Sequence, residues 1–196
     1  MLEATIALIS TTALLLGSPG PAPIALAASG ASFGIKNRLP FLTGIILGLA
    51  IAIAGAALGL ATLFSTFPNA KNLVQIIGGA YICYIAYKIA TSSLSVQNEK
   101  SNAPTIRDGF IFNLLNPKAY AAFLAIFSQF LLPATNIIIS YFLTGLVCIL
   151  VALVVDSIWL LFGNILRPVF SKPEQAKVTR LFLAIGMVIA VVWSFL

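Results

Sequence analysis

The sequence predicts an all-α integral membrane protein of six transmembrane helices, built as two inverted three-helix repeats whose first and fourth helices are broken. Of its 196 residues, 60% are hydrophobic and only 8% are charged, and the mean hydropathy is +1.07. A soluble domain carries about 25% charged residues, so this chain cannot cover itself with a water-soluble surface. Two short proline-containing interruptions inside apolar segments, separated by about half of the chain, indicate the two repeats.

Six apolar segments are long enough to cross a bilayer, which takes about 20 helical residues. Helix is expected in each segment, because the bilayer core has no water to satisfy unpaired backbone groups. The runs also lack the alternating pattern of a barrel strand. The expected spans, all within one transmembrane domain, are residues 4–33, 40–64, 73–90, 109–132, 137–163 and 178–196.

The beginning of the chain shares one feature with a signal peptide, which is an apolar run followed by small residues. A signal peptide starts with positive charge, whereas the only charged side chain near this start is Glu3. We therefore assign this stretch to the first span.

Basic side chains follow the first, third and fifth spans, which by the positive-inside rule makes these connections cytoplasmic and places both termini outside. Three spans are an odd number, so the second half enters the membrane from the opposite side. The repeats, about 1–97 and 98–196, are therefore expected to be inverted in a multi-pass protein of the plasma (inner) membrane. The basic residues are Lys36, Arg38, Lys88, Lys100, Arg107, Arg167, Lys172, Lys177 and Arg180, whereas the other connections carry only Lys71.

The first interruption contains three prolines in five residues. Pro19, Pro21 and Pro23 remove three backbone donors and disfavour helical conformation in the residues that precede them. A helix is therefore expected to stop near Gly17 and to restart at Pro21 or Pro23. In the second interruption, an Asn-Pro pair at 116–117 has the pattern of a helix N-cap and first helical residue.

Broken helices place polar backbone groups inside the membrane. A restarting helix directs N–H groups and a partial positive charge at the break, and a stopping helix offers carbonyls. An amino-acid zwitterion would find donors for its carboxylate and acceptors for its ammonium group. Prolines that merely kink the helices are the alternative, but the polar counterpart in the other half favours a site. The candidate substrate-binding residues are Ser18, Pro19, Gly20, Pro21, Asn113, Asn116, Pro117 and Lys118.

Two charged residues lie within the expected spans away from the span ends. An ionisable group in hydrocarbon costs at least ~2.5–3.5 kcal/mol, so it is expected to be functional and to have a partner. Asp156 is the candidate proton-coupling residue, which would exchange a proton for a substrate ammonium; a structural polar contact is the alternative. For Lys118 the alternative is a side chain that extends toward the cytoplasmic edge. One acid and one base neutralise one zwitterion, which favours neutral over basic amino acids.

An Asn-Leu-Leu-Asn-Pro-Lys-Ala segment is followed by a Gln-Phe pair, with Ser128 directly before the pair. This and several other motifs resemble those of the LysE/RhtB family of amino-acid exporters, and the resemblance covers nearly the whole chain. The segment and the pair are its most specific part, although the family usually has proline where this chain has Ser128. The resemblance implies a six-span inner-membrane carrier that exports amino acids or related metabolites, driven by the proton gradient. The residues that carry it are 19–21, 78–81, 84, 87–88, 108–110, 113–119 and 129–130.

Other functions fit the sequence less well. A membrane redox carrier would need a thiol at each break, and neither Cys83 nor Cys148 lies near one. The chain has no His and its acids are scattered, which disfavours a metal site and a hydrolase. A passive pore or a structural membrane subunit is the main alternative to a carrier.

We expect no enzymatic activity and no cofactor. The net charge of +6 is spread over three short connections rather than one face, so no nucleic-acid partner is expected. The expected partners are a small amino-acid substrate, protons and the lipid bilayer. The oligomeric state is left open, a homo-oligomer included.

Topology gives the first testable prediction. Reporter fusions after Lys36, near Ser101 and near Ser171 should all give cytoplasmic signals, because the basic connections face inside. Fusions at either terminus serve as the matched external controls. A periplasmic signal near Ser101 would contradict the inverted repeats, since three spans place that connection opposite the N-terminus.

Overall fold

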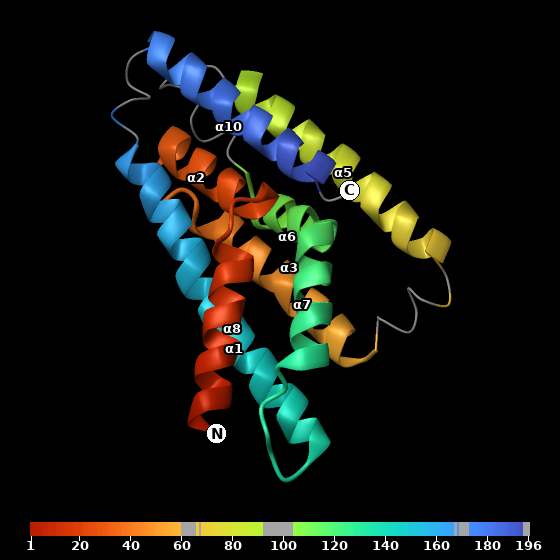
Figure 1. Cartoon of the computed structure of the whole chain (residues 1–196). Helices are drawn as coiled ribbons and strands as arrows, with labels where there is room; N and C mark the ends of the chain where they lie inside the picture. Colours follow the sequence, from red (N-terminus) through yellow and green to blue (C-terminus); the bar gives the residue numbers. More distant parts are fainter. Residues whose placement is uncertain (60–65, 67, 92–103, 167, 169–172, 194–196) are drawn as a thin grey trace.

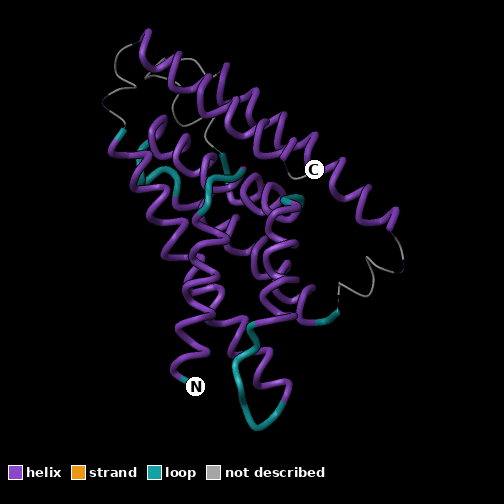
Figure 2. Tube along the Cα trace, in the orientation of Figure 1, coloured by secondary structure: helices purple, strands orange, loops and turns teal. Residues whose placement is uncertain are grey.

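A computed structural model describes residues 1–59, 66, 68–91, 104–166, 168 and 173–193 of the chain. Helices joined by short connections make up these ranges, and Figure 2 shows no strand among the described residues. The all-α class is therefore confirmed for this part of the chain. The helices are α1 (Leu2–Gly17), α2 (Pro21–Phe33), α3 (Leu39–Ala57), α5 (Pro68–Thr91), α6 (Ile106–Leu114), α7 (Pro117–Gln129), α8 (Ile137–Ile165) and α10 (Pro173–Trp193).

Both predicted interruptions are present. The chain bends by 65° between α1 and α2 and by 60° between α6 and α7. At the first break Ser18 is extended and α2 restarts with Pro21. At the second, the Asn116 side chain accepts a hydrogen bond from the Lys118 N–H at 3.2 Å and Pro117 is the first helical residue. Proline chemistry and a side-chain cap thus define the two restarts as expected.

The described helices support two to four of the six predicted spans. By length and composition, α3 and α8 can each cross a membrane, and each bent pair can do so if it counts as one span. Helices α5 and α10 occupy the third and sixth expected spans but do not meet the same test over their described residues.

Some helix boundaries differ from the predicted ones for local reasons. Helix α6 begins three residues before the expected 109, because Thr105 and Asp108 form a reciprocal capping box. Helix α7 ends at Gln129 rather than 132, and the connection that follows is bonded to α8. Leu132 donates its N–H to the Thr144 hydroxyl at 3.0 Å, and its carbonyl accepts from Ser140.

Part of the sequence predictions falls outside the described residues. This applies to residues 60–64 and 194–196 at the ends of two expected spans. It also applies to Lys100, Arg167 and Lys172, to the fusion sites Ser101 and Ser171, and to the side chains of Lys71, Lys88 and Arg180.

Each half of the chain packs against the broken helix of the other half. Helix α3 contacts α6 and α7 of the second half, and α8 contacts α1 and α2 of the first. Helices α5 and α10 lie side by side along one flank (Figure 1). The helices that follow the two broken pairs run in opposite directions in Figure 1: α3 descends where its counterpart α8 rises, and α5 rises where its counterpart α10 descends.

Buried Arg38 connects the two halves at the end of the molecule shared by α2 and α6. Its guanidinium lies 4.0 Å from the centre of the Phe33 ring, and Nη1 donates to the Pro104 carbonyl at 3.3 Å. Pro104 comes directly before the cap of α6. The α2–α3 connection and the start of α6 therefore lie at the same end, as the sequence predicts for two cytoplasmic connections.

Glycines allow the helices of the two halves to approach closely at this end. A Cβ atom at Gly163 of α8 would overlap the carbonyl oxygen of Ala27 in α2. A Cβ at Gly109 of α6 would likewise overlap the Phe41 carbonyl oxygen of α3. Backbone against backbone leaves no flexible side chain to yield, so both contacts require glycine.

Gly163→Ala should therefore lower the stability of the folded protein. The added methyl forces α2 and α8 apart, and overpacking of this kind costs about 1–3 kcal/mol. Thermal unfolding of the purified protein in detergent measures the change. Gly186→Ala is the matched control, because its Cβ would lie 3.4 Å from the flexible Ile24 Cδ1. Equal melting temperatures for the two variants would contradict a close α2–α8 contact.

Candidate functional site at the two helix breaks

The first break presents the carboxyl end of α1. The helix ends at Gly17, and the Ser18 N–H makes the last bond back to Leu14 O at 3.0 Å. Ser18 and Pro19 are exposed, whereas Gly20 and Pro21 are buried. The carbonyls of Gly17 and Ser18 cannot be used by the next helix turn, because the chain leaves the helix there. They need partners from elsewhere.

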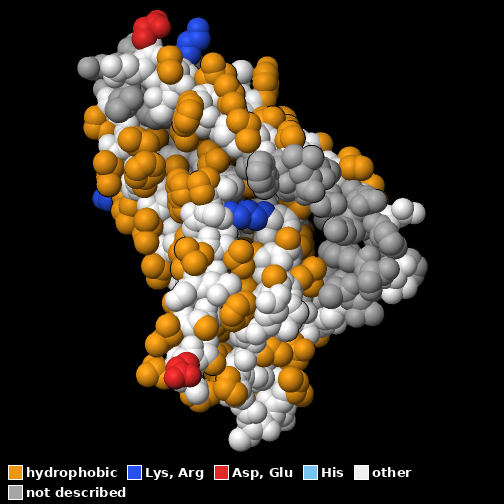
Figure 3. Space-filling model, in the orientation of Figure 1, with side chains coloured by type: hydrophobic (Ala, Val, Ile, Leu, Met, Phe, Trp, Pro, Cys, Tyr) orange, Lys and Arg blue, Asp and Glu red, His pale blue; other side chains and the backbone are white. Residues whose placement is uncertain are grey.

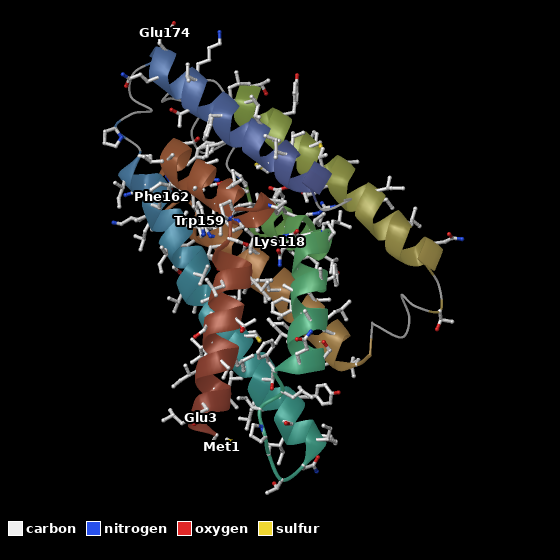
Figure 4. All side chains as sticks on the ribbon, in the orientation of Figure 1. Met1, Glu3, Lys118, Trp159, Phe162 and Glu174 are labelled. Carbon is white, nitrogen blue, oxygen red and sulfur yellow. The ribbon has the colours of Figure 1, made fainter. Side chains whose placement is uncertain are left out.

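Lys118, from the second break, supplies one of these partners. Its Nζ donates to the Ser18 carbonyl at 2.6 Å and to the Ser18 hydroxyl at 2.8 Å. Figure 4 shows Lys118 between α1 and α7, and in Figure 3 a basic surface is visible at the same place on this face. The two breaks therefore touch, through residues that are 100 positions apart in the sequence.

Trp159 of α8 supplies the other partner. Its indole Nε1 donates to the Gly17 carbonyl at 3.3 Å, and Figure 4 shows the side chain beside the upper end of α1. Tyr120 acts in the same way at the second break, where its hydroxyl donates to the Leu114 carbonyl at 2.7 Å. Neither residue is among the site residues predicted from the sequence, although an aromatic side chain with a polar tip inside an apolar span is a usable signal.

Asn113 and Asn116 are bonded within the protein. Asn113 donates to the Ile45 carbonyl of α3 at 3.2 Å, and Asn116 donates to the Asn113 side-chain oxygen at 3.4 Å. Their exposed fractions are only 1% and 3%. Asn113 and Asn116 thus connect the second break to α3. Asn116 also accepts the Lys118 backbone N–H as the N-cap of α7.

Asp156 lies in α8, one helical turn before Trp159 and Leu160. Its exposed fraction is 4%, and among the described residues its Oδ2 accepts no hydrogen bond. The charged side chain with which the Asp156 carboxyl interacts electrostatically is Lys118. A buried carboxylate oxygen without a donor is unusual, because desolvation costs free energy that a hydrogen bond normally offsets.

The restarting helices offer fewer N–H donors than the sequence predicts. Pro21 and Pro23 have none, and Ile24 N is bonded to Gly20 O, which leaves Ala22 in the first turn of α2. In α7, Lys118 N is bonded to the Asn116 side chain, and the N–H of the next residue to the Asn116 carbonyl. The main donor at the breaks is therefore the Lys118 ammonium rather than helix N-termini.

The predicted residues thus fall into three groups. Ser18, Gly20 and Lys118 are in contact, and Asp156 interacts with Lys118 through charge. Pro19, Pro21 and Pro117 shape the breaks, and the two asparagines connect the second break to α3. Cys148 contacts Thr12 at 3.8 Å, and the described residues contain no cluster of potential metal ligands.

Comparisons with known proteins place the chain among transporters. A family model described as LysE type translocator matches residues 13–193. The homoserine/homoserine lactone efflux protein of Salmonella typhimurium is 25% identical over 194 residues, which cover 94% of each chain. An uncharacterized membrane protein of Vibrio cholerae is 24% identical over 195 residues, or 94% of this chain and 95% of that protein. No solved structure matches the chain.

Gly20→Ala should displace the Lys118 ammonium from Ser18. A Cβ at residue 20 would lie 2.8 Å from Lys118 Nζ and 2.9 Å from its Cδ, which is too close for either pair of atoms. We expect Lys118 to react several-fold faster with an amine-selective acylating reagent, as mapped by mass spectrometry.

Gly17→Ala is the matched control for this experiment, because its Cβ would make only an ordinary contact, 3.7 Å from Val155 Cγ1. Labelling of Lys118 at the wild-type rate in Gly20→Ala would show that the lysine does not depend on the space beside Gly20.

Proposed function

The chain belongs to the LysE type translocator family, and we propose that it exports a small, neutral amino acid or derivative in exchange for protons. It is a multi-pass membrane protein of a family of transporters. The observation that carries the proposal is the contact of Lys118 with Ser18, which joins the two helix breaks, and the charge interaction of Lys118 with buried Asp156 supports it.

The proposed site can bind both charged groups of a zwitterion. The carbonyls of Gly17 and Ser18 at the end of α1 are acceptors for a substrate ammonium. The Lys118 ammonium has three N–H donors, two of which bond Ser18 in the substrate-free protein, and it is the proposed donor to a substrate carboxylate. The Ala22 N–H at the start of α2 is a second donor on the same break.

Substrate charge follows from the small number of ionisable groups. Lys118 and Asp156 together carry one positive and one negative charge, and a zwitterion adds none. A lysine or arginine substrate would bring a second positive charge that has no acidic partner at the breaks, at a cost of several kcal/mol. The name of the Salmonella relative, a homoserine/homoserine lactone efflux protein, also favours a small polar substrate.

Asp156 is the proposed proton carrier. It is buried, one oxygen lacks a donor among the described residues, and its charge interacts with that of Lys118. Protonation would remove a negative charge from the site, and deprotonation would restore an anionic partner for an ammonium group. A carboxylate with a purely structural role would be expected to have its hydrogen bonds satisfied.

We further propose that the two halves, about residues 1–97 and 98–196, are inverted repeats of three spans each. The opposite directions of corresponding helices and the packing of each half on the broken helix of the other support this organisation. The binding site would then lie where the two repeats meet, as in other carriers with broken helices. Two repeats of three spans each would put both termini on the same side of the membrane, which the positive-inside rule predicts to be the outer side.

Proteoliposomes test the proposed function. Wild-type protein should catalyse counterflow of labelled threonine or homoserine and accumulate it when a pH gradient is imposed. Lysine and arginine should compete ~10-fold less well, since their second charge has no partner. A passive pore would give neither counterflow nor accumulation, and faster exchange of basic amino acids would contradict the charge balance at the breaks.

Asp156→Asn should abolish accumulation driven by the pH gradient while the protein still folds and inserts. The amide keeps the size and polarity of the side chain but cannot release a proton. Glu3→Gln is the matched control, because it removes an exposed carboxylate at the start of α1. If Asp156→Asn accumulated substrate at the wild-type rate, the carboxylate would be structural.

A further inference from the structure

The Lys118 ammonium lies where a substrate ammonium is expected to bind. The Ser18 carbonyl, directly after the last residue of α1, is one of the acceptors proposed above for a substrate ammonium. Lys118 already bonds it through its own Nζ at 2.6 Å, and the same Nζ bonds the adjacent Ser18 hydroxyl at 2.8 Å. Because Nζ is itself a primary ammonium, the lysine reproduces the charge and the donor geometry of such a ligand.

Gly20 provides the space for this contact. Its φ of −166° is extended backbone, which any residue can adopt, so chain conformation does not require glycine at this position. A side chain would instead collide with Lys118 Nζ and Cδ. The absence of a Cβ is therefore explained by the lysine that lies against it.

The position of Lys118 leaves a second potential partner unused. Asp156 is the charged group with which Lys118 interacts, yet Oδ2 of Asp156 accepts no hydrogen bond among the described residues. Lys118 is therefore bonded to the Ser18 oxygens, while the buried carboxylate with which it interacts through charge stays without a donor on Oδ2 among the described residues. An ammonium that leaves Ser18 would still be attracted by the Asp156 carboxylate when that group is charged, which lowers the cost of the displacement.

We propose that Lys118 occupies the ammonium subsite of the empty carrier and that the substrate ammonium displaces it from Ser18. The inference rests on the proposed function and adds an internal competitor to it. The displaced lysine pairs with the substrate carboxylate or with Asp156. A ligand without an ammonium group cannot take the place of Lys118 on Ser18.

Removal of the lysine should therefore weaken the binding of a substrate carboxylate and strengthen the binding of a substrate ammonium. A carboxylate loses its donor, whereas an ammonium gains a subsite that is no longer occupied. The apparent affinity of a ligand falls in proportion to the fraction of protein whose site is vacant. If the lysine fills the subsite about nine-tenths of the time, its removal raises ammonium affinity ~10-fold.

Three related probes separate these effects. L-threonine carries both charged groups, L-threonine amide carries only the ammonium, and 3-hydroxybutyrate carries only the carboxylate. Each is titrated against purified protein at mildly acidic pH, and affinity is read from the rise in melting temperature, since a ligand that binds the folded form stabilises it. Wild type is compared with Lys118→Met and Lys118→Gln, so that the test survives if one of them fails to fold.

We expect the amide to bind ~10-fold more tightly to both Lys118 variants than to wild type, and 3-hydroxybutyrate to lose any binding. Lys36→Met is the control for net charge, because it removes an exposed lysine outside the breaks, and it should leave the amide affinity unchanged.

The two possible failures are distinguishable. Unchanged or weaker amide binding to the Lys118 variants, with wild type still stabilised by threonine, overturns the internal competitor and leaves the proposed function intact. No response of any protein to any of the three probes contradicts the neutral amino-acid site itself, and the inference with it.

Discussion

The structure depends on backbone carbonyls that prolines leave without helical partners inside apolar segments. Water is absent from a bilayer core, so each such carbonyl must find a donor within the protein. At the first break these donors come from the other half of the chain, Lys118 on Ser18 and Trp159 on Gly17. The requirement to satisfy one broken helix therefore joins the two halves at the point where a ligand is proposed to bind.

The rest of the fold supports this junction with contacts of a different kind. Helices α2 and α8 meet backbone to backbone at Gly163, and α3 and α6 do so at Gly109. Such contacts are short and involve no adjustable side chains, so they fix the half-helices against the helices that they pack on. The contact between Lys118 and Ser18 is polar and lies at the end of a long side chain. The backbone contacts hold the half-helices in place, whereas the lysine side chain can change its partner.

The sequence predicts the features that depend on local chemistry. Prolines and the Asn-Pro pair locate both breaks, and Asp156 and Lys118 stand out because ionisable groups are rare in apolar spans. The sequence does not reveal which donor satisfies which carbonyl, since Lys118 and Ser18 are 100 residues apart and Trp159 and Gly17 are 142 apart. It also overestimates the N–H groups at the restarts, because the same prolines that break the helix remove the donors and Asn116 uses another.

The loss of these donors determines how a zwitterion can be bound. Helix N-termini would offer a fixed positive end, but here the principal donor is a charged side chain that is already bonded to the acceptors for the opposite end of the substrate. In the proposed carrier, filling the ammonium subsite and supplying the carboxylate partner are consequently one event, because the same lysine leaves the first and becomes the second. A ligand with only an ammonium group displaces the lysine but offers it no carboxylate, and a ligand with only a carboxylate does not displace the lysine. Recognition of the whole zwitterion in the proposed carrier then requires no more than one lysine, one buried acid and a glycine that leaves space for the lysine.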